Sequence, residues 1–399
     1  MSDGGPVRVA HLSVVHRADD PRIFERECRA LADHGYDVSF LVPRPPGGET
    51  ARDGVRLVGL TPRRRAARWL DTGEILRAVR RLRPHVVHFH DPELLLLVPL
   101  LRALVPRLVY DMHEYDALEV GMKYYVPARL RPLAPRAVAA AQRSLAALTD
   151  GVVAVVDDQF EVLGRRPALR LALPNYPRFS RFAQPTADPE LAADRRLKLI
   201  YIGSLTRHRG IPTALAVMGQ VKDEAVLYLG GTFSNPEFEA EVRALVEPHD
   251  APLHGAVRLL GRVPPEKVPA QLAAADVVWV PATAAGQHQR RLVTTKLFEG
   301  LAVGLAALVS DLPGRGDVVT VEGCGLAVPP TRQGHLKGVR RLLADREAVQ
   351  AMGARGRQAV RERYSWERLE LDLVDFYARL CGGPHPTEPA SRPPTIPES

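Results

Sequence analysis

The chain has 399 residues, of which 46% are hydrophobic and 25% are charged, a globular composition with enough apolar material for two or three domains. No apolar run reaches the roughly 20 residues of a membrane-spanning helix, and no signal-peptide pattern precedes the first predicted strand. Cys28, Cys324 and Cys381 lie far apart without metal-type spacing. A reducing, cytoplasmic location is therefore expected.

The formal net charge is +8, and residues 1–185 carry most of it, with 28 Lys/Arg against 21 Asp/Glu. A basic surface suits nucleic acid, an anionic membrane or an acidic substrate, although an Arg-rich composition also places arginine on any exposed face. The sequence has no RNA-binding sheet motif, zinc-finger spacing or basic zipper, so no nucleic-acid partner is expected. Peripheral association with the inner membrane surface stays open, as does the oligomeric state.

Short β-rich runs alternate with longer amphipathic helices through residues 1–180. Strands are predicted at 7–15, 36–43, 85–90, 108–114 and 152–156, and helices at 22–35, 74–84, 93–104 and 137–151. Repeated strand–helix–strand units predict a parallel sheet with helices on both faces. These residues are interpreted as one N-terminal domain.

A second series of the same kind follows a Pro-rich and charged linker, placed at 181–196. Its strands are predicted at 197–205, 225–231, 257–263, 276–281, 305–311 and 325–330, within a C-terminal domain over 197–364. The Pro-rich tail, 382–399, is expected to be disordered. The predicted fold is α/β, with two doubly wound Rossmann-like domains facing a central cleft, where ligands bind at the carboxyl ends of the strands.

The loop after the first strand, "HRADDPRIFER", concentrates polar side chains. Asp20 is predicted to cap the following helix, with Pro21 at its first position. His16, Asp19 and Arg22 have no such local explanation and are candidate site residues, together with Asp20.

Histidine and acidic residues also end two successive predicted strands. His90 with Asp91 ends one, and His113 with Glu114 ends the next. Strand-end loops are commonly polar, but histidine at neighbouring strand ends suits proton transfer near neutral pH. Their spacing is not a known ligand pattern, so no metal site is expected.

The loop "GSLTRHRG" after the first strand of the second domain resembles an anion site. Gly203 permits close approach of a ligand, Arg207 and Arg209 add positive charge, and a helix is predicted to start near Ile211. An exposed basic loop is the alternative. Neither a GxGxxG fingerprint nor a GxxxxGK[ST] phosphate loop is present.

The stretch "TTKLFEGLAVG" predicts a short helix with two charges, Lys296 and Glu299, capped by Thr294 or Thr295. Its apolar side chains share one face: Leu297, Phe298, Leu301 and Ala302. An ordinary ion pair on the helix surface would by itself explain why Lys296 and Glu299 are present. A helix start after a buried strand instead faces a ligand, where a carboxylate can hold a ribose diol and an amine can reach phosphate.

The ordered motifs resemble those of the retaining nucleotide-sugar glycosyltransferases of GT-B fold, family 4 type, over about residues 7 to 380. They are "HRADDPRIFERECRALADHGYDV", "VVHFHDPELL", "YDMHE", "LPNYP", "YIGSLTRHRG", "LLGRVPPEKVPAQLAAADVVWVP", "KLFEGLAVGLAALVSDLPG" and "YSWERL". The resemblance implies a donor site in the C-terminal domain and a terminal helix, 365–381, that crosses back to the N-terminal domain.

Particular residues match the family's motifs. Glu299 would hold the ribose hydroxyls and Arg209 the diphosphate. Ser204 stands where many members have a second arginine, so that contact is either missing or supplied by Lys296. The remaining donor-side positions are Gly203, Arg262, Val263 and Leu297, of which Arg262 and Val263 match the loop that touches the nucleobase. His113 would lie near the donor sugar and the acceptor. The acceptor-side candidates are His16, Asp19, Asp20, Arg22, His90, Asp91 and Glu114.

One position departs from the family. Arg291 stands where the first glutamate of a paired-glutamate motif normally contacts the donor sugar. A subset with a Lys-x-x-Glu core resembles this chain better, so the departure leaves the sugar unidentified without implying inactivity.

The expected activity is transfer of a sugar from a nucleoside-diphosphate sugar to a hydroxyl of a small-molecule, lipid-linked or glycan acceptor. The resemblance implies retention of anomeric configuration, no metal or other cofactor, and a role in glycan, glycolipid or glycosylated natural-product biosynthesis. Two alternatives stay open: a nucleotide-sugar 2-epimerase of the same fold, and a non-catalytic donor-binding partner subunit.

Overall fold

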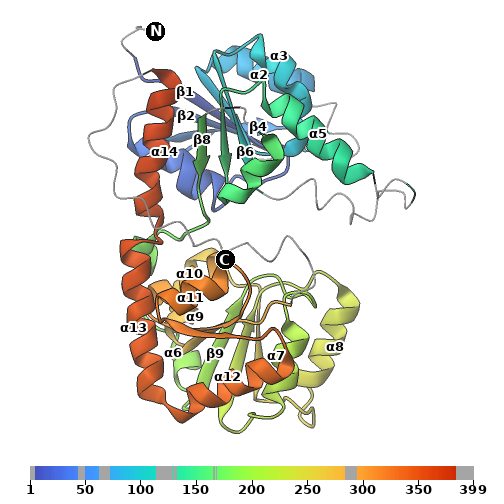
Figure 1. Ribbon diagram of the computed structural model, residues 1–399, viewed down its shortest axis with the longest axis vertical. Coiled ribbons are helices and arrows are strands. Elements are labelled where there is room, and N and C mark those ends of the chain that lie inside the picture. The colour runs from blue at the N-terminus through green and yellow to red at the C-terminus, as the bar shows by residue number, and fades with distance from the viewer. Residues whose placement is uncertain are drawn as a thin grey trace. The chain divides into compact units, whose positions relative to one another are not determined.

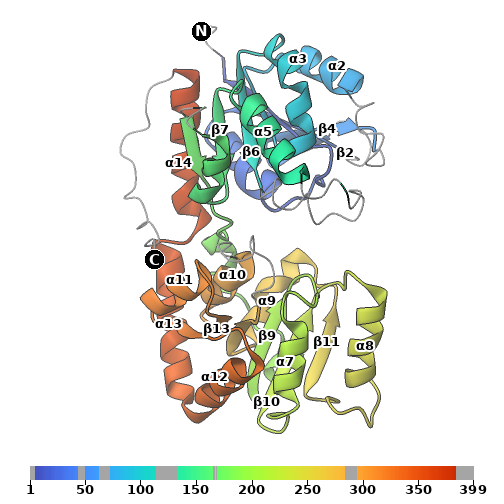
Figure 2. The ribbon, with the colours of Figure 1, turned by 45° about the vertical axis from the view of Figure 1, so that its right-hand side comes forward.

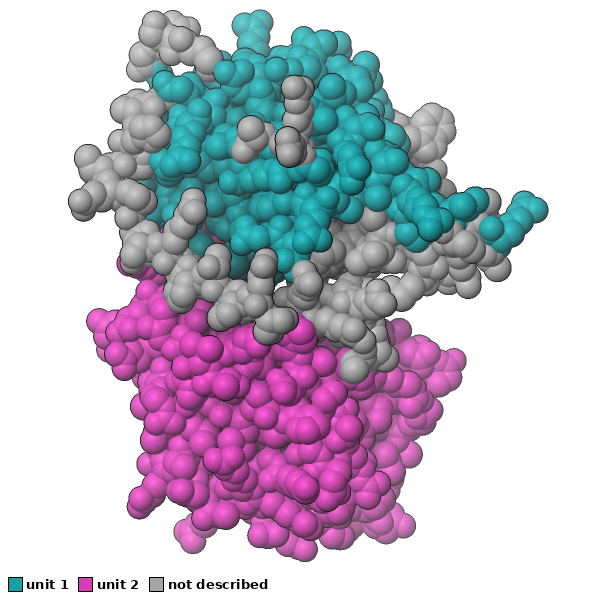
Figure 3. Space-filling model, in the orientation of Figure 1, with its two compact units in different colours: residues 1–174, 369–391 teal, residues 175–368, 392–399 magenta. Residues whose placement is uncertain are grey.

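The computed structural model describes residues 5–43, 50–62, 72–113, 129, 133–164, 167, 169–283 and 294–382. The chain divides into two compact units, shown in different colours in Figure 3. The first unit combines Met1–Pro174 with Leu369–Ser391, and the second combines Asn175–Arg368 with Arg392–Ser399. The first unit therefore draws on segments from both halves of the sequence.

An eight-stranded sheet forms the centre of the first unit, in the order β3-β4-β2-β1-β5-β6-β7-β8 (Figure 1). The strands are β1 (Arg8–Leu12), β2 (Asp37–Pro43), β3 (Thr50–Arg52), β4 (Val55–Leu60), β5 (Val86–Phe89), β6 (Arg107–Met112), β7 (Gly151–Ala154) and β8 (Leu169–Ala172). All pair in parallel except β3, which is antiparallel to β4. The sequence did not predict β3, β4 or β8, which are short or flanked by charged residues.

Helices cover this sheet: η1 (Ile23–Cys28), α1 (Arg29–Asp33), α2 (Thr72–Leu82), η3 (Pro92–Leu97), α3 (Val98–Arg102), α5 (Ala134–Ala146), η6 (Asp157–Leu163) and α14 (Trp366–Cys381). The helix predicted at 22–35 begins as the π-helix η1 and becomes α-helical only at Arg29. The N-cap residue of η1 is Arg22 rather than the expected Asp20, although Asp20 Oδ1 accepts hydrogen bonds from the backbone N–H groups of Arg22 and Ile23, both at 2.9 Å.

Six parallel strands form the sheet of the second unit, in the order β11-β10-β9-β12-β13-β14. They are β9 (Leu197–Ile202), β10 (Ala225–Gly230), β11 (Val257–Gly261), β12 (Val277–Val280), β13 (Ala306–Ser310) and β14 (Gly325–Val328). Each lies within a run predicted to be a strand, because long apolar runs bounded by turn residues are typical of strands buried on both faces.

The helical segments of the second unit are η7 (Phe179–Phe182), α6 (Pro189–Ala192), α7 (Ile211–Met218), α8 (Pro236–Val246), η8 (Pro265–Lys267), α9 (Val268–Ala273), α10 (Thr295–Val303), α11 (Arg315–Val321), α12 (Arg332–Ala344) and α13 (Arg346–Glu362). Helices α7, α8 and α12 lie along the sheet (Figure 2), and side chains from these helices and from the strands form one apolar core. Helix α10 packs against α9 and α13. The expected linker, 181–196, contains α6 and is part of this unit.

Each sheet has one point where the strand order reverses, between β1 and β5 in the first unit and between β9 and β12 in the second. Ligands of open parallel sheets bind beyond the carboxyl ends of the strands at such points. Among the described helices, none has the length and apolar character needed to cross a bilayer.

Helix α10 lies close to β12 because Gly300 faces it. A Cβ at Gly300 would lie 2.5 Å from Val278 Cβ. We expect Gly300→Ala to destabilise the protein by about 1–3 kcal/mol, because overpacking a tight contact displaces backbone or side chains. Gly219→Ala is the matched control, since its added methyl would meet nothing closer than 3.8 Å. Denaturant unfolding that ranks both variants equal to the wild type would contradict this packing argument.

Candidate functional site

The loop after β9 is shaped by glycines at the reversal point of the second sheet. Gly203 has φ +149, and a Cβ there would lie 2.9 Å from Lys296 Cε, so glycine leaves room for the lysine side chain. Gly210, at φ +81, precedes α7, and a Cβ there would lie 1.6 Å from the carbonyl oxygen of Pro281. The loop after β9 is thereby held against the segment that follows β12.

Three cations influence one another electrostatically beside this loop: Arg209, Lys296 and Arg315. Desolvation, and then the positive charge of Arg209, lowers the pKa of Lys296 to about 7, although Glu299 opposes the shift. Desolvation and Arg209 likewise lower the pKa of Arg315 to about 10. Like charges at this proximity favour an anion with more than one negative charge, such as a diphosphate.

Tyr201 forms part of the same group. Its hydroxyl donates to the Ser204 carbonyl at 2.9 Å, and Lys296 Nζ lies 5.0 Å from its ring centroid. The aromatic ring attracts the ammonium group of Lys296 but does not neutralise its charge, as a carboxylate would. Arg315, the first residue of α11, was not predicted as a site residue, because a single arginine in a Gly-rich turn carries no sequence signal.

Helix α10 presents Lys296 and Glu299 as predicted from its periodicity. The apolar face is fully buried, while Lys296 and Glu299 are only partly buried. Thr294 occupies the N-cap position, but its hydroxyl makes no capping hydrogen bond, which corrects the expectation of a side-chain cap.

The other donor-side candidates lie at the same sheet edge, but most of their side chains are exposed to solvent. Val263 packs over Gly230, where a Cβ would lie 2.7 Å from Val263 Cγ2, while Arg262 and Ser204 are exposed. Arg207 pairs with Glu241 at 2.5 Å on the surface and does not join the three cations. Arg291 lies outside the described residues.

Asp111, at the end of β6, is the centre of a buried network in the first unit. Its carboxylate accepts from Arg22 Nη2 at 3.1 Å and lies 3.2 Å from His90 Nδ1 and 2.9 Å from His113 Nε2. Desolvation acts against ionisation, but the Arg22 guanidinium and His113 outweigh it and hold the pKa of Asp111 well below its ordinary value. Sequence reasoning missed Asp111, although strand alternation places it on the same side of β6 as His113.

Hydrogen bonds hold the loop after β1 to the end of β5. The Asp91 carboxylate accepts from the Ser13 hydroxyl at 2.9 Å and the Val14 N–H at 2.6 Å. His16 Nδ1 lies 3.0 Å from Asp20 Oδ2. Desolvation opposes protonation of His16, but the Asp20 carboxylate outweighs it and raises the pKa of that imidazole.

Most of the acceptor-side candidates therefore lie, together with His113, in one polar cluster at the carboxyl edge of the first sheet: His16, Asp20, Arg22, His90 and Asp91. Asp19 does not belong to it, because its exposed carboxylate pairs with Arg17 at 3.0 Å. Glu114 lies outside the described residues.

Comparison with known families matches both units. The family model described as Glycosyltransferase Family 4 matches residues 22–168, and that of Glycosyl transferases group 1 matches residues 184–359. Together they account for most of both parallel-sheet units. The chain belongs to the family 4, group 1 glycosyltransferases.

Two curated relatives match about half of this chain. A putative colanic acid biosynthesis glycosyltransferase, WcaL of Escherichia coli, is 24% identical over 48% of this chain and 47% of its own length. A GDP-mannose-dependent α-(1-6)-phosphatidylinositol monomannoside mannosyltransferase of Mycobacterium tuberculosis is 29% identical over 48% of this chain and 51% of its own length. The matched region thus spans about half the length of each relative.

Solved structures resemble the chain over nearly its whole length. Sucrose-phosphate synthase from Thermosynechococcus elongatus has a TM-score of 0.73 at 19% identity, covering 94% of this chain and 99% of that one. The lipopolysaccharide glycosyltransferase WaaG has a TM-score of 0.65 at 15% identity, covering 92% and 99%. Anabaena HepE, solved with UDP and glucose, has a TM-score of 0.71 at 11% identity, covering 94% and 100%. This likeness confirms the predicted GT-B class of fold, with two Rossmann-like domains.

Arg22 is expected to stabilise the first unit by compensating the buried Asp111. We predict that Arg22→Met destabilises the protein by about 3–5 kcal/mol, because a buried carboxylate then loses its cation. Arg17→Met removes an exposed ion pair and should cost less than about 1 kcal/mol. Equal midpoints of denaturant unfolding for the two variants would show that the Arg22–Asp111 pair is not needed.

Lys296 gives the stability of the ligand-free protein a specific pH dependence. Between pH 7 and about 10 the unfolded lysine keeps a proton that the folded one has lost, so the contribution of Lys296 to stability rises with pH. We predict that Lys296→Met reduces this rise, while Lys337→Met, at an exposed position of α12, does not. Denaturation midpoints at pH 7, 8 and 9 give the slopes, and parallel slopes for all three proteins would disprove the assignment.

Proposed function

We propose that this protein transfers a sugar from a nucleoside-diphosphate sugar to an acceptor hydroxyl, with retention of anomeric configuration. The observation that carries the proposal is the group of Arg209, Lys296 and Arg315 beside the Gly203 loop. A departing nucleoside diphosphate carries the multiple negative charge that such a group stabilises.

Each part of the donor has a candidate partner in the second unit. Arg209, Lys296 and Arg315 receive the diphosphate, and Glu299, one helical turn along α10 from Lys296, accepts hydrogen bonds from the ribose diol. Arg262 and Val263, after β11, contact the nucleobase. The backbone around Gly203 and Ser204 approaches the phosphates, and Leu297 supports the site from the buried side of α10.

Charge stabilisation by these side chains supports transfer without a metal at the donor site. Positive charge held in place before the reaction lowers the energy of the transition state without reorganisation. The leaving phosphate oxygen takes the proton of the acceptor hydroxyl, so the proposal names no protein nucleophile. His113, held by Asp111 at 2.9 Å, orients the reacting groups on the acceptor side.

The two curated relatives favour an acceptor from glycan or glycolipid synthesis. One is named for colanic acid biosynthesis and the other for a phosphatidylinositol monomannoside. We therefore place a growing polysaccharide or a lipid-linked sugar ahead of a soluble small molecule. The net charge of +8 favours approach to an anionic membrane surface, where a lipid-linked acceptor would be found.

Calorimetric titration with UDP-, GDP-, ADP- and dTDP-sugars tests the donor assignment. We expect one nucleotide class to bind well above the others, and slow hydrolysis of that donor to be lost in Glu299→Ala. Binding of none of the four classes would refute the proposal. If the protein converts the donor to its 2-epimer without any acceptor, it is an epimerase. If it binds the donor but shows no turnover, with or without glycan and lipid acceptors, it is a donor-binding subunit.

The contribution of Arg209 can be separated from that of the nucleoside contacts. We predict that Arg209→Ala weakens binding of the nucleoside diphosphate by about 10- to 100-fold, the loss of a charge-assisted hydrogen bond, and changes nucleoside binding little. Arg207→Ala is the matched control, because that side chain pairs with Glu241. An equal loss for nucleoside and diphosphate would assign Arg209 a structural role instead.

A further inference from the structure

Three histidines lie side by side within the first sheet, beneath the polar cluster at its edge. His11 of β1 is the register partner of His88 of β5, and His90 follows two residues later. Because side chains alternate along a strand, all three lie on the same face, opposite to Ala10, Leu12, Val87 and Phe89 of the apolar core. His11 and His88 are fully buried and His90 is nearly so.

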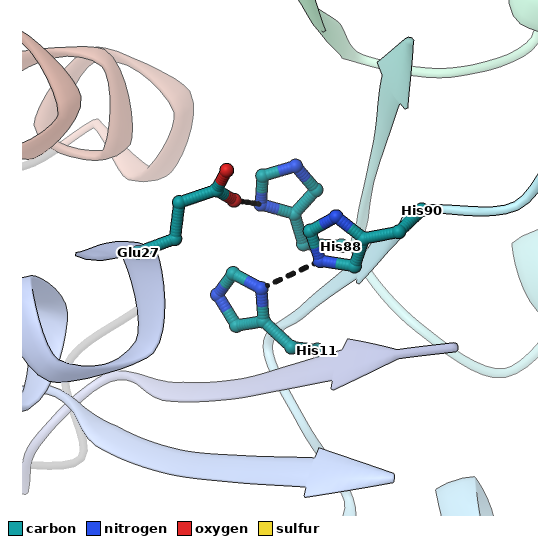
Figure 4. Close-up of side chains that lie close together, drawn as sticks. All are labelled: His11, Glu27, His88 and His90. Carbon is teal, nitrogen blue, oxygen red and sulfur yellow. Dashed lines mark hydrogen bonds and ion pairs between the residues drawn. The ribbon is translucent and has the colours of Figure 1, made fainter. Parts of the chain in front are cut away.

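Glu27, from the π-helix η1, completes a four-residue cluster with these rings (Figure 4). His11 Nδ1 lies 2.9 Å from His90 Nε2, and His88 Nδ1 lies 4.0 Å from Glu27 Oε2. One nitrogen or oxygen from each residue can be chosen so that all four atoms lie within 4.8 Å of one another. π-Helical turns are frequent at functional sites, because the extra residue per turn redirects a side chain.

Several polar atoms of this cluster lack a hydrogen bond. His11 Nε2, His88 Nε2 and Glu27 Oε2 are buried without one, whereas Glu27 Oε1 lies 3.1 Å from Arg22 Nε in an ion pair. Buried polar atoms are nearly always satisfied, and exceptions require a specific cause such as an ion.

Further side chains hold the cluster from outside, as the outer shells of metal sites do. His90 Nδ1 lies 3.2 Å from the Asp111 carboxylate while its Nε2 is directed to His11. His88 Nδ1 lies 2.8 Å from the hydroxyl of Tyr377, which belongs to α14. A carboxylate on the second nitrogen of a ligating histidine sets its tautomer and orientation.

We propose that His11, His88, His90 and Glu27 bind a divalent transition metal ion of the zinc type within the first unit. Three imidazoles and one carboxylate suit tetrahedral zinc, and a shift of about 1 Å would bring the ligands to zinc distances. With all four residues buried, the site is a closed, structural one that ties β1, β5 and η1 together.

An overlapping group, Glu27, His90, Asp111 and His113, is a weaker candidate. Asp111 already receives the Arg22 guanidinium and lies within hydrogen-bond distance of both histidines. The carboxylate of Asp111 is therefore satisfied without an ion, whereas His11 Nε2 and His88 Nε2 have no hydrogen-bond partner. Neither group could be recognised from sequence patterns, because the ligands come from distant segments; His11 and His90, for example, are 79 residues apart.

Metal binding by the tag-free full-length protein tests the proposal. The chain is unfolded with denaturant and chelator, then refolded with Co²⁺ or Zn²⁺ in slight excess and freed of unbound ion. We expect one equivalent of metal per chain, the visible absorption of tetrahedral Co²⁺, and a melting temperature above that of protein refolded without metal. Refolded protein that retains no metal would overturn the proposal.

Variants show where the ion binds. We expect His88→Asn and Glu27→Gln each to lose the bound equivalent, the absorption and the metal-dependent rise in melting temperature. The control is His249→Ala with His254→Ala, which removes an exposed, stacked histidine pair in the second unit, with centroids 5.1 Å apart, that could bind ions adventitiously. Retention of tetrahedral Co²⁺ by folded Glu27→Gln and His88→Asn, or its loss from the control, would refute the assignment.

Discussion

Parallel strand pairing gathers most charged side chains of the second unit's ligand site at one edge of its sheet. The strands of the second unit are largely apolar because helices cover both faces, so charged groups concentrate where the strands end. Gly203 and Gly210 then bring the loop after β9 and the start of α10 to the same point. Without this constraint Lys296 and Glu299 would be an ordinary pair on a helix surface.

Opposite charges are paired in the first unit, whereas like charges are grouped in the second. In the first unit Arg22, Asp111, His16 and Asp20 compensate one another within a rigid network. In the second unit Arg209, Lys296 and Arg315 raise one another's electrostatic energy, which a bound anion would relieve. A group of like charges that an anion would stabilise agrees with the proposed binding of a nucleoside-diphosphate donor.

Sequence patterns predicted the features that depend on local periodicity. The six strands of the second sheet, the start of α7 and the apolar face of α10 all follow from runs and spacing within about ten residues. The π-helical start at Ile23, the missing cap at Thr294 and the role of Asp111 could not be read this way. Each depends on tertiary contacts, and the pairing of His11 with His88 is set by strand register across 77 residues.

Because α14 belongs largely to the first unit, that unit is completed by residues near the end of the chain. Its residues from Leu369 onward belong to the first unit, where Tyr377 contacts His88 and Phe376 packs on Gly151. During synthesis the ribosome must translate Asn175–Arg368 of the second unit before these side chains emerge. Until then the sheet face that carries His88 lacks this part of its cover, which gives an incoming ion access to the imidazoles before folding closes the interior.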